Sequence, residues 1–300
     1  MSTAQYSLGT LGRRSSSRLV IRRVAGRVFL ALCLGATLSG IFALGVLLYT
    51  VSADGIGRLN WDFFSTYPSR FADQAGAKSA IYGTVWVMAF TALFAVPIGI
   101  GAAIYLEEFA ARNWLTKVIE TNINNLAGVP SIIYGLLGLT IFVRIMALDR
   151  SVIAGGLTLA LLVLPIVIVA SREGLRAVPP SIREASLGLG ATKWQTVWFQ
   201  VLPPAMPSIL TGVILALSRA IGETAPLIMI GALTFIAFTP TGPGSPFTTL
   251  SIQIFNWISR PQPGFADTAA AGIIVLLGVL LVMNGFAVGL RMYFERKRRW

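Results

Sequence analysis

Two charged residues, Arg219 and Glu223, lie four positions apart inside a strongly apolar stretch of the chain. That spacing predicts that both side chains share one face of a helix. A charge within a bilayer costs about 2.5–3.5 kcal/mol on insertion scales, so it faces protein or water and usually has a role. The planar guanidinium of arginine suits a tetrahedral oxyanion, and Glu223 would hold Arg219 until such an anion arrives. A purely structural ion pair is the alternative interpretation.

The residues around this pair predict a break in the helix and a close helix contact. Pro226 has no N–H, so the carbonyl of Gly222 loses its helical partner. Such a break at membrane depth is tolerated where it lines a cavity, and Thr224 adds a hydroxyl there; a simple proline kink is the alternative. Gly212 and Ala216 would continue the face of Arg219 and let another helix approach closely.

A polar segment upstream predicts two short helices joined by a turn. Ser181 with Glu184 three residues later is a capping-box pattern, and a second helix is expected from Thr192 to the prolines Pro203 and Pro204. The turn between them falls at Gly188 and Gly190, and the apolar residues of the second helix are Trp194, Val197, Trp198 and Phe199. Exposed apolar surface of this kind marks a partner site, or else an interfacial helix resting on lipid.

The composition places these residues in a membrane protein. Hydrophobic residues make up 55% of the chain and charged residues 12%, with a mean hydropathy of +0.75. Soluble domains carry about 25% charged residues. We therefore expect an all-α polytopic membrane protein with six transmembrane helices, since only helices or closed barrels cross lipid and no strand-like alternation is present. The expected spans are residues 28–51, 81–106, 126–147, 152–171, 207–237 and 269–292.

The first span has a second possible interpretation. Val51-Ser52-Ala53 resembles the cleavage site of a secretory signal. The apolar run from Val28 to Val51 is longer than the 7–15 residues of a signal, which favours a retained membrane anchor.

Lysine and arginine predict the orientation. With the N-terminus inside, seventeen of the 24 Lys and Arg residues lie on inside segments, six lie outside, and Arg219 remains within a span. Basic residues concentrate on the cytoplasmic side, so both termini are expected inside. Residues 238–268, rich in Pro, Gly and Thr, then form a second external loop, and its turn-forming residues exclude a regular helix in its first part. The expected organisation is a basic tail (1–27), a first helix (28–51), an external loop (52–79), a core (80–292) with a cytoplasmic loop (172–206), and a basic tail (293–300).

Several classes of function are excluded or disfavoured. The chain has no His and a single Cys33, so histidine catalysis and an intrachain disulfide are excluded. No G-x-x-x-x-G-K-[ST] phosphate loop occurs, so another subunit would have to hydrolyse any ATP. We expect no enzyme activity, no metal and no cofactor. The net charge of +12 is a topology signal, without the basic–aromatic pattern of a nucleic-acid surface.

Three stretches carry a resemblance to a known family. Glu184-Ala185-Ser186, then Gly190, then Leu202-Pro203 resembles the EAA loop of ABC-importer permeases, although Ser186 and Gln200 depart from it. Residues 125–138 (NLAGVPSIIYGLLG) and 219–227 (RAIGETAPL) resemble the PstA family of phosphate-importer permeases. Residues 81–84 and 102–106 agree as well, so that the resemblance covers roughly residues 76–292.

The resemblance implies a bacterial or archaeal plasma (inner) membrane protein with a type I ABC importer fold. It implies a sister permease of the PstC type, an ATPase dimer of the PstB type, a phosphate-binding protein of the PstS type outside, and inorganic phosphate as cargo. By this resemblance, Glu184, Ala185, Ser186, Gly190, Leu202 and Pro203 contact the ATPase. The cargo would pass Arg219, Glu223 and Thr224.

One departure leaves the anion ligands open. Many relatives carry Arg-Thr-Thr at the inner end of the fourth span, where this chain has Val169-Ala170-Ser171, with Arg172 following. The chain therefore uses either Arg172 or Arg219 with the partner subunit. Three alternatives to phosphate import stay open: an ABC permease for molybdate or sulfate, a secondary transporter, and a membrane protein that signals phosphate status.

Overall fold

The computed structural model describes residues 8–232 and 235–296, which are mostly helical. It divides into two units, residues 1–53 and 54–300. The first unit is formed by helix α1 (Leu8–Gly55). Arg22–Arg58 is long and apolar enough to cross a membrane. Residues 8–27 of the predicted basic tail continue this helix, whereas residues 1–7 lie outside the described part of the chain.

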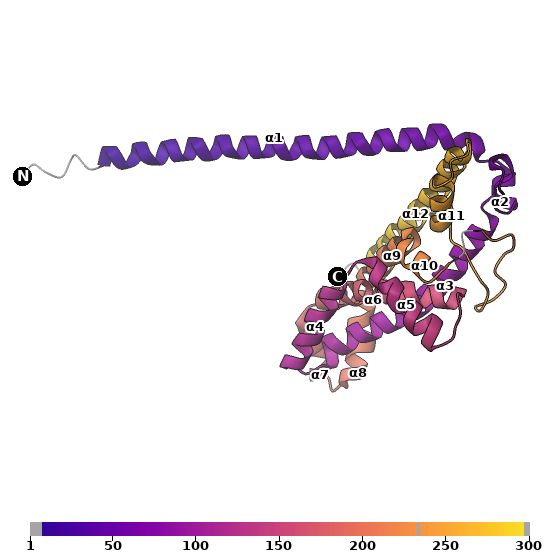
Figure 1. Ribbon diagram of the computed structural model, residues 1–300. Coiled ribbons are helices and arrows are strands. Elements are labelled where there is room, and N and C mark those ends of the chain that lie inside the picture. The colour runs from indigo at the N-terminus through magenta and orange to yellow at the C-terminus, as the bar shows by residue number, and fades with distance from the viewer. Residues whose placement is uncertain (1–7, 233–234, 297–300) are drawn as a thin grey trace, which may run out of the picture. The chain divides into compact units, whose positions relative to one another are not determined.

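The second unit is a bundle of helices (Figure 1). Its α-helices are α2 (Trp61–Ser65), α3 (Lys78–Ile104), α4 (Trp114–Leu126), α5 (Ser131–Gly138), α6 (Val152–Arg176), α7 (Pro180–Gly188), α8 (Lys193–Thr196), α9 (Leu202–Gly222), α10 (Ala225–Met229), α11 (Leu250–Ile258) and α12 (Phe265–Arg296). Three π-helical turns extend them: η3 (Tyr105–Phe109), η4 (Leu139–Ile145) and η5 (Val197–Val201). Figure 1 shows α7 and α8 at one end of the unit and α2 toward the other.

Helix α6 is the centre of the packing. Its side chains Val163, Val167 and Leu175 are fully buried in the main apolar cluster, to which α3 and α9 also contribute. The Thr91 hydroxyl of α3 donates a hydrogen bond to the Gly156 carbonyl of α6, at 3.2 Å. Small residues permit the contact between α6 and α9, because a Cβ on Gly212 would lie 2.3 Å from Cβ of Ala170. The expectation that Gly212 admits another helix is confirmed.

The predicted span 126–147 corresponds to α5 with η4, over residues 131–145, and a sharp bend that was not predicted precedes it. Helices α4 and α5 are separated by a short break and bent by 105°, a geometry of a broken span or re-entrant loop. Pro130 ends the first helix because it lacks an N–H and disfavours helical backbone at the residue before it. Five described helices are long and apolar enough to cross a membrane, or six with this bent pair.

The predicted span 207–237 is wrong at both ends. The helix begins at Lys193, and it ends at Gly222, where Glu223 has extended backbone (φ −74°, ψ 126°). The predicted break near Pro226 is confirmed, and it stops the helix instead of kinking it. Arg219 is therefore in the last turn of the helix and not in its middle. Residues 233 and 234 of the predicted span lie outside the described residues.

Two local predictions in the polar segment are also wrong. Pro203 and Pro204 do not stop the second short helix, because the chain stays helical from Lys193 to Gly222. Directly before them the backbone widens into a π turn, in which the N–H of Leu202 bonds the Val197 carbonyl. Ser181 does not cap the first helix, which begins one residue earlier at Pro180, where a missing N–H costs nothing.

The two predicted external loops differ in content. Residues 52–79 contain α2, whose first turn is capped by the Asn60 side chain. The expected absence of a regular helix after residue 238 is confirmed as far as Thr249, and α11 follows at Leu250. Gln253 and Trp257 of α11 are completely buried, so this second loop is a packed part of the unit.

The contact at Gly212 predicts a strong effect of a larger side chain. Gly212→Val forces α9 away from Ala170 and should lower the free energy of unfolding by about 1–3 kcal/mol. The melting temperature of the detergent-purified protein measures this. Gly278→Val is the matched control, because a Cβ at Gly278 meets nothing within 4 Å. Equal melting temperatures for the two variants would contradict the packing described.

Candidate functional site

Arg219 and Glu223 form an ion pair at the end of α9. Arg219 Nε lies 3.4 Å from Glu223 Oε1. The Arg219 side chain is 51% exposed and that of Glu223 is 17% exposed. The structure therefore brings the two residues together as expected, but across the end of the helix. The arginine keeps most of its donors available.

Nearby hydroxyl groups lie against the backbone carbonyls at the end of α9. The Thr224 hydroxyl lies 3.5 Å from the Gly222 carbonyl, the group that Pro226 leaves without a helical partner. Ser251 of α11 donates a hydrogen bond to the Glu223 carbonyl at 3.3 Å. Because lipid offers no hydrogen bonds, these contacts allow the helix to end within the protein.

The two motifs that resemble phosphate permeases lie against one another. A Cβ on Gly135 of α5 would lie 2.7 Å from Cα of Pro226, so only glycine lets α10 pack there. The Tyr134 hydroxyl donates to the Leu126 carbonyl across the bend between α4 and α5, at 2.7 Å. Sequence reasoning singled out both motifs and missed their contact, since they are some 90 positions apart.

The polar segment forms an exposed surface. Trp194, Trp198 and Phe199 are exposed, and the indole rings of Trp194 and Trp198 stack at 5.8 Å. Val197 is buried, contrary to expectation. Thr192 begins the helix with a complete capping box, as its hydroxyl and the Gln195 side chain each bond the other's backbone N–H. We name the exposed residues Glu184, Leu187, Leu189, Trp194, Trp198 and Phe199 the loop surface.

The residues expected to contact the ATPase have different environments. Glu184, Ala185 and Gly190 are exposed, and Pro203 is exposed as well. Ser186 is half-buried and shares a hydrogen bond with Thr196 at 2.9 Å. Leu202 is half-buried too. The turn needs glycine at Gly190, whose φ is +85°.

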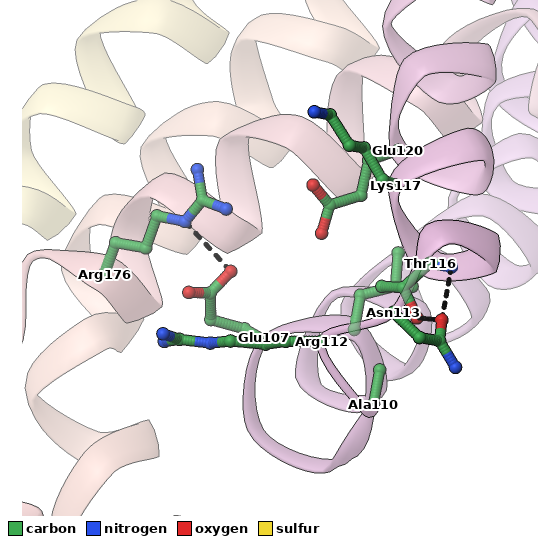
Figure 2. Close-up of a pocket in the computed structure, with 9 residues that line it drawn as sticks. Glu107, Ala110, Arg112, Asn113, Thr116, Lys117, Glu120 and Arg176 are labelled. Carbon is green, nitrogen blue, oxygen red and sulfur yellow. Dashed lines mark hydrogen bonds and ion pairs between the residues drawn. The ribbon is translucent and has the colours of Figure 1, made fainter.

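A group of charged residues that sequence reasoning missed lies behind this surface. We name it the arginine–carboxylate network: Glu107, Glu108, Glu120, Arg172, Arg176 and Arg183. Figure 2 shows part of it around a pocket of about 580 Å³, with Arg176 reaching Glu107 at 2.9 Å. The sequence signal that could have revealed this network is the adjacent pair Glu107 and Glu108 at the end of an apolar stretch.

Arg172 belongs to this network. Its side chain is 6% exposed and contacts Glu107 at 3.4 Å and Glu120 at 2.6 Å. Two carboxylates already balance its charge, so it is a poor anion ligand here. Of the two arginines left open by the sequence, Arg219 is the accessible one.

The fold and these two sites define a helical membrane permease, and the comparisons with known proteins agree. Residues 95–299 match the family described as binding-protein-dependent transport system inner membrane component. The chain belongs to this family. It is thus a transport subunit of the inner membrane.

Similar proteins narrow the resemblance. The phosphate transport system permease protein PstA of Yersinia pestis is 33% identical over 279 residues, covering 92% of each chain. PstA 1 of Mycobacterium tuberculosis strain H37Rv is 33% identical over 84% of this chain and 83% of its own. The probable ABC transporter permease protein YqgI of Bacillus subtilis is 32% identical over 85% of this chain and 88% of its own. The resemblance to phosphate-importer permeases is confirmed.

Solved structures show the same fold. A bacterial alginate ABC transporter matches with a TM-score of 0.64 at 17% identity, over 87% of this chain and 92% of that one. The MetNI methionine ABC transporter, in an inward-facing form, matches with a TM-score of 0.57 at 17% identity, over 72% and 96%. The predicted all-α, type I ABC importer fold is confirmed.

The positive φ of Gly190 predicts a backbone effect at the loop surface. Gly190→Ala should strain the turn by about 1–2 kcal/mol and increase trypsin cleavage after the exposed Lys193. Gly188→Ala, in ordinary helical backbone with equally open space, is the control. The rates of trypsin cleavage, measured on the two purified variants, test this prediction. Equal rates for the two variants would show that the turn does not depend on φ.

Proposed function

We propose that this chain is a transmembrane permease subunit of an ATP-driven importer of inorganic phosphate. The observation that carries the proposal is the half-exposed Arg219, paired with Glu223 at a helix end whose sequence resembles phosphate permeases. The relatives named as phosphate transport system permeases support the same cargo.

The geometry suits transient binding of phosphate. Among the described residues, Glu223 holds the Arg219 guanidinium through Nε, at 3.4 Å, which leaves its other donors to meet an oxyanion. Glu223 repels the bound anion and competes for the arginine, which limits the affinity. A transport site needs binding that is strong enough for entry and weak enough for release. Thr224 adds a hydroxyl donor beside the pair.

The exposure of Arg219 calls for a second subunit. A charge at this depth faces protein or water rather than lipid, and Arg219 is 51% exposed in this chain alone. A sister permease of the PstC type completes the path from the other side. The binding protein of the PstS type docks outside, on loops 52–79 and 238–268.

The loop surface meets the ATPase. In the proposed orientation both termini and residues 172–206 are cytoplasmic, as the distribution of Lys and Arg indicates. The chain has no phosphate loop of its own, so a PstB-type dimer hydrolyses ATP. Closure of that dimer moves α7 and α8 and turns the path outward, and hydrolysis returns it inward with phosphate.

Arg219 supplies a direct test of this function. Arg219→Gln removes the charge that draws phosphate and should lower uptake of labelled phosphate at micromolar supply by at least about tenfold, which corresponds to about 1.4 kcal/mol. Co-purification with the partner subunits should be unchanged. Arg144→Gln, an exposed arginine elsewhere, is the control. Normal uptake by the Arg219 variant would sink the assigned role.

Glu184 tests the partner surface separately. Glu184→Gln removes an exposed carboxylate from α7 and should reduce the amount of ATPase that co-purifies with the permease, while its melting temperature stays unchanged. We expect uptake to fall in proportion, because the importer is uncoupled. Glu173→Gln, which is equally exposed on α6, serves as the comparison. If both variants retain the ATPase fully, the loop surface is not its docking site.

A further inference from the structure

The first connection that the arginine–carboxylate network makes joins α7, which carries part of the loop surface, to η3. Arg183 of α7 makes a two-pronged ion pair with Glu108 of η3, with its Nη2 2.7 Å from Glu108 Oε1. The same guanidinium donates to the carbonyls of Leu175 and Val178, at 2.9 and 2.7 Å. Glu108 is 8% exposed. Paired, charge-assisted hydrogen bonds of this kind fix geometry as well as adding energy, so α7 and η3 move together.

A second joint leads from η3 to α4. Glu107 follows directly in the same π turn and contacts both Arg172 and Arg176 of α6. Arg172 in turn holds Glu120 of α4, at 2.6 Å. Figure 2 shows Glu107 and Glu120 at the edges of the same pocket. Four elements are thus joined, namely η3, α4, α6 and α7.

The contacts continue from α4 to the anion site. The end of α4 is held to α5 by the hydrogen bond from Tyr134 to the Leu126 carbonyl. Helix α5 packs through Gly135 on Pro226 of α10. Pro226 lies three residues after Glu223, the partner of Arg219. Each step is a close packing contact or a hydrogen bond within the second unit.

We propose that Glu108, Glu107 and Glu120, held by Arg183 and Arg172, are positioning residues that transmit movement of α7 to the bend between α4 and α5. Through that bend they set the access of phosphate to Arg219. The inference rests on the proposed function, since it gives the route by which the ATPase acts on the cargo path. It assigns a role to carboxylates that touch neither the ATPase nor phosphate.

Glu120 is the network residue that can be replaced to test transmission without unfolding the protein. Its side chain is 31% exposed, whereas Arg172 is 6% exposed and Glu108 8%. Removing one partner of a deeply buried pair leaves an uncompensated charge, so we expect variants of Arg172 or Glu108 to destabilise the fold strongly. Without Glu120, Arg172 still has Glu107, and the joint between α7 and η3 remains intact.

The test uses the full complex of this chain with its sister permease, ATPase and phosphate-binding protein, reconstituted in liposomes. Hydrolysis of ATP and uptake of labelled phosphate are measured together. For Glu120→Gln we expect hydrolysis within about twofold of the wild type and uptake lower by at least about tenfold, so that more ATP is spent per phosphate. Glu120→Asp keeps the carboxylate and should recover most of the uptake. Asp149→Asn, at an exposed carboxylate outside the network, should leave the ratio unchanged.

Hydrogen exchange supplies a readout that does not depend on transport. In the wild-type complex, ATP should change exchange in α7, α4 and α5 together; in Glu120→Gln the change should persist in α7 and vanish in α4 and α5. A wild-type ratio of ATP to phosphate in Glu120→Gln, or unchanged exchange of α4 in the wild type, would overturn the inference. If the wild type takes up no phosphate, the proposed function fails instead, and the exchange result still decides whether α7 and α4 are coupled.

Discussion

The structure depends most on how a helix can end where lipid offers no hydrogen bonds. An unsatisfied carbonyl in hydrocarbon costs several kcal/mol, so the end of α9 at Gly222 needs protein around it. The Thr224 hydroxyl lies beside the Gly222 carbonyl and Ser251 donates to the Glu223 carbonyl, while α5 packs on the following helix α10. As a result, α9 ends with Arg219 half exposed and Glu223 mostly buried beside it. Broken helices serve transport sites in this way.

A single long helix places this site at a fixed distance from the loop surface. The helix runs from Lys193 to Gly222, and at 1.5 Å per residue Arg219 lies about 40 Å from its start. The exposed aromatic residues stand at one end of the helix and Arg219 stands near the other. In the proposed mechanism the arginine–carboxylate network adds a second route, along α4 and α5, from α7 to the bend before α5.

Hydropathy and charge predicted much of the fold and the break near Pro226, but not the bend before α5. The apolar stretches predicted the helices α3, α6 and α12, and the spacing of Arg219 and Glu223 predicted their ion pair. The bend before α5 was missed because Trp114–Leu126 is amphipathic and has no bilayer-length apolar run. The prediction that Pro203 and Pro204 stop the helix failed because the π turn before them, which accommodates both prolines, leaves no recognisable pattern in the sequence. The partners of Glu107, Glu108 and Glu120 are 52–75 positions away, which local patterns do not record.

The most direct measurement of the central claim is anion uptake at micromolar supply. Labelled phosphate, sulfate and molybdate are compared in cells that lack this chain and in the same cells carrying it again. The account predicts that phosphate uptake alone falls and then returns. A loss of sulfate or molybdate uptake with phosphate unaffected would leave the permease fold in place and contradict the assigned cargo.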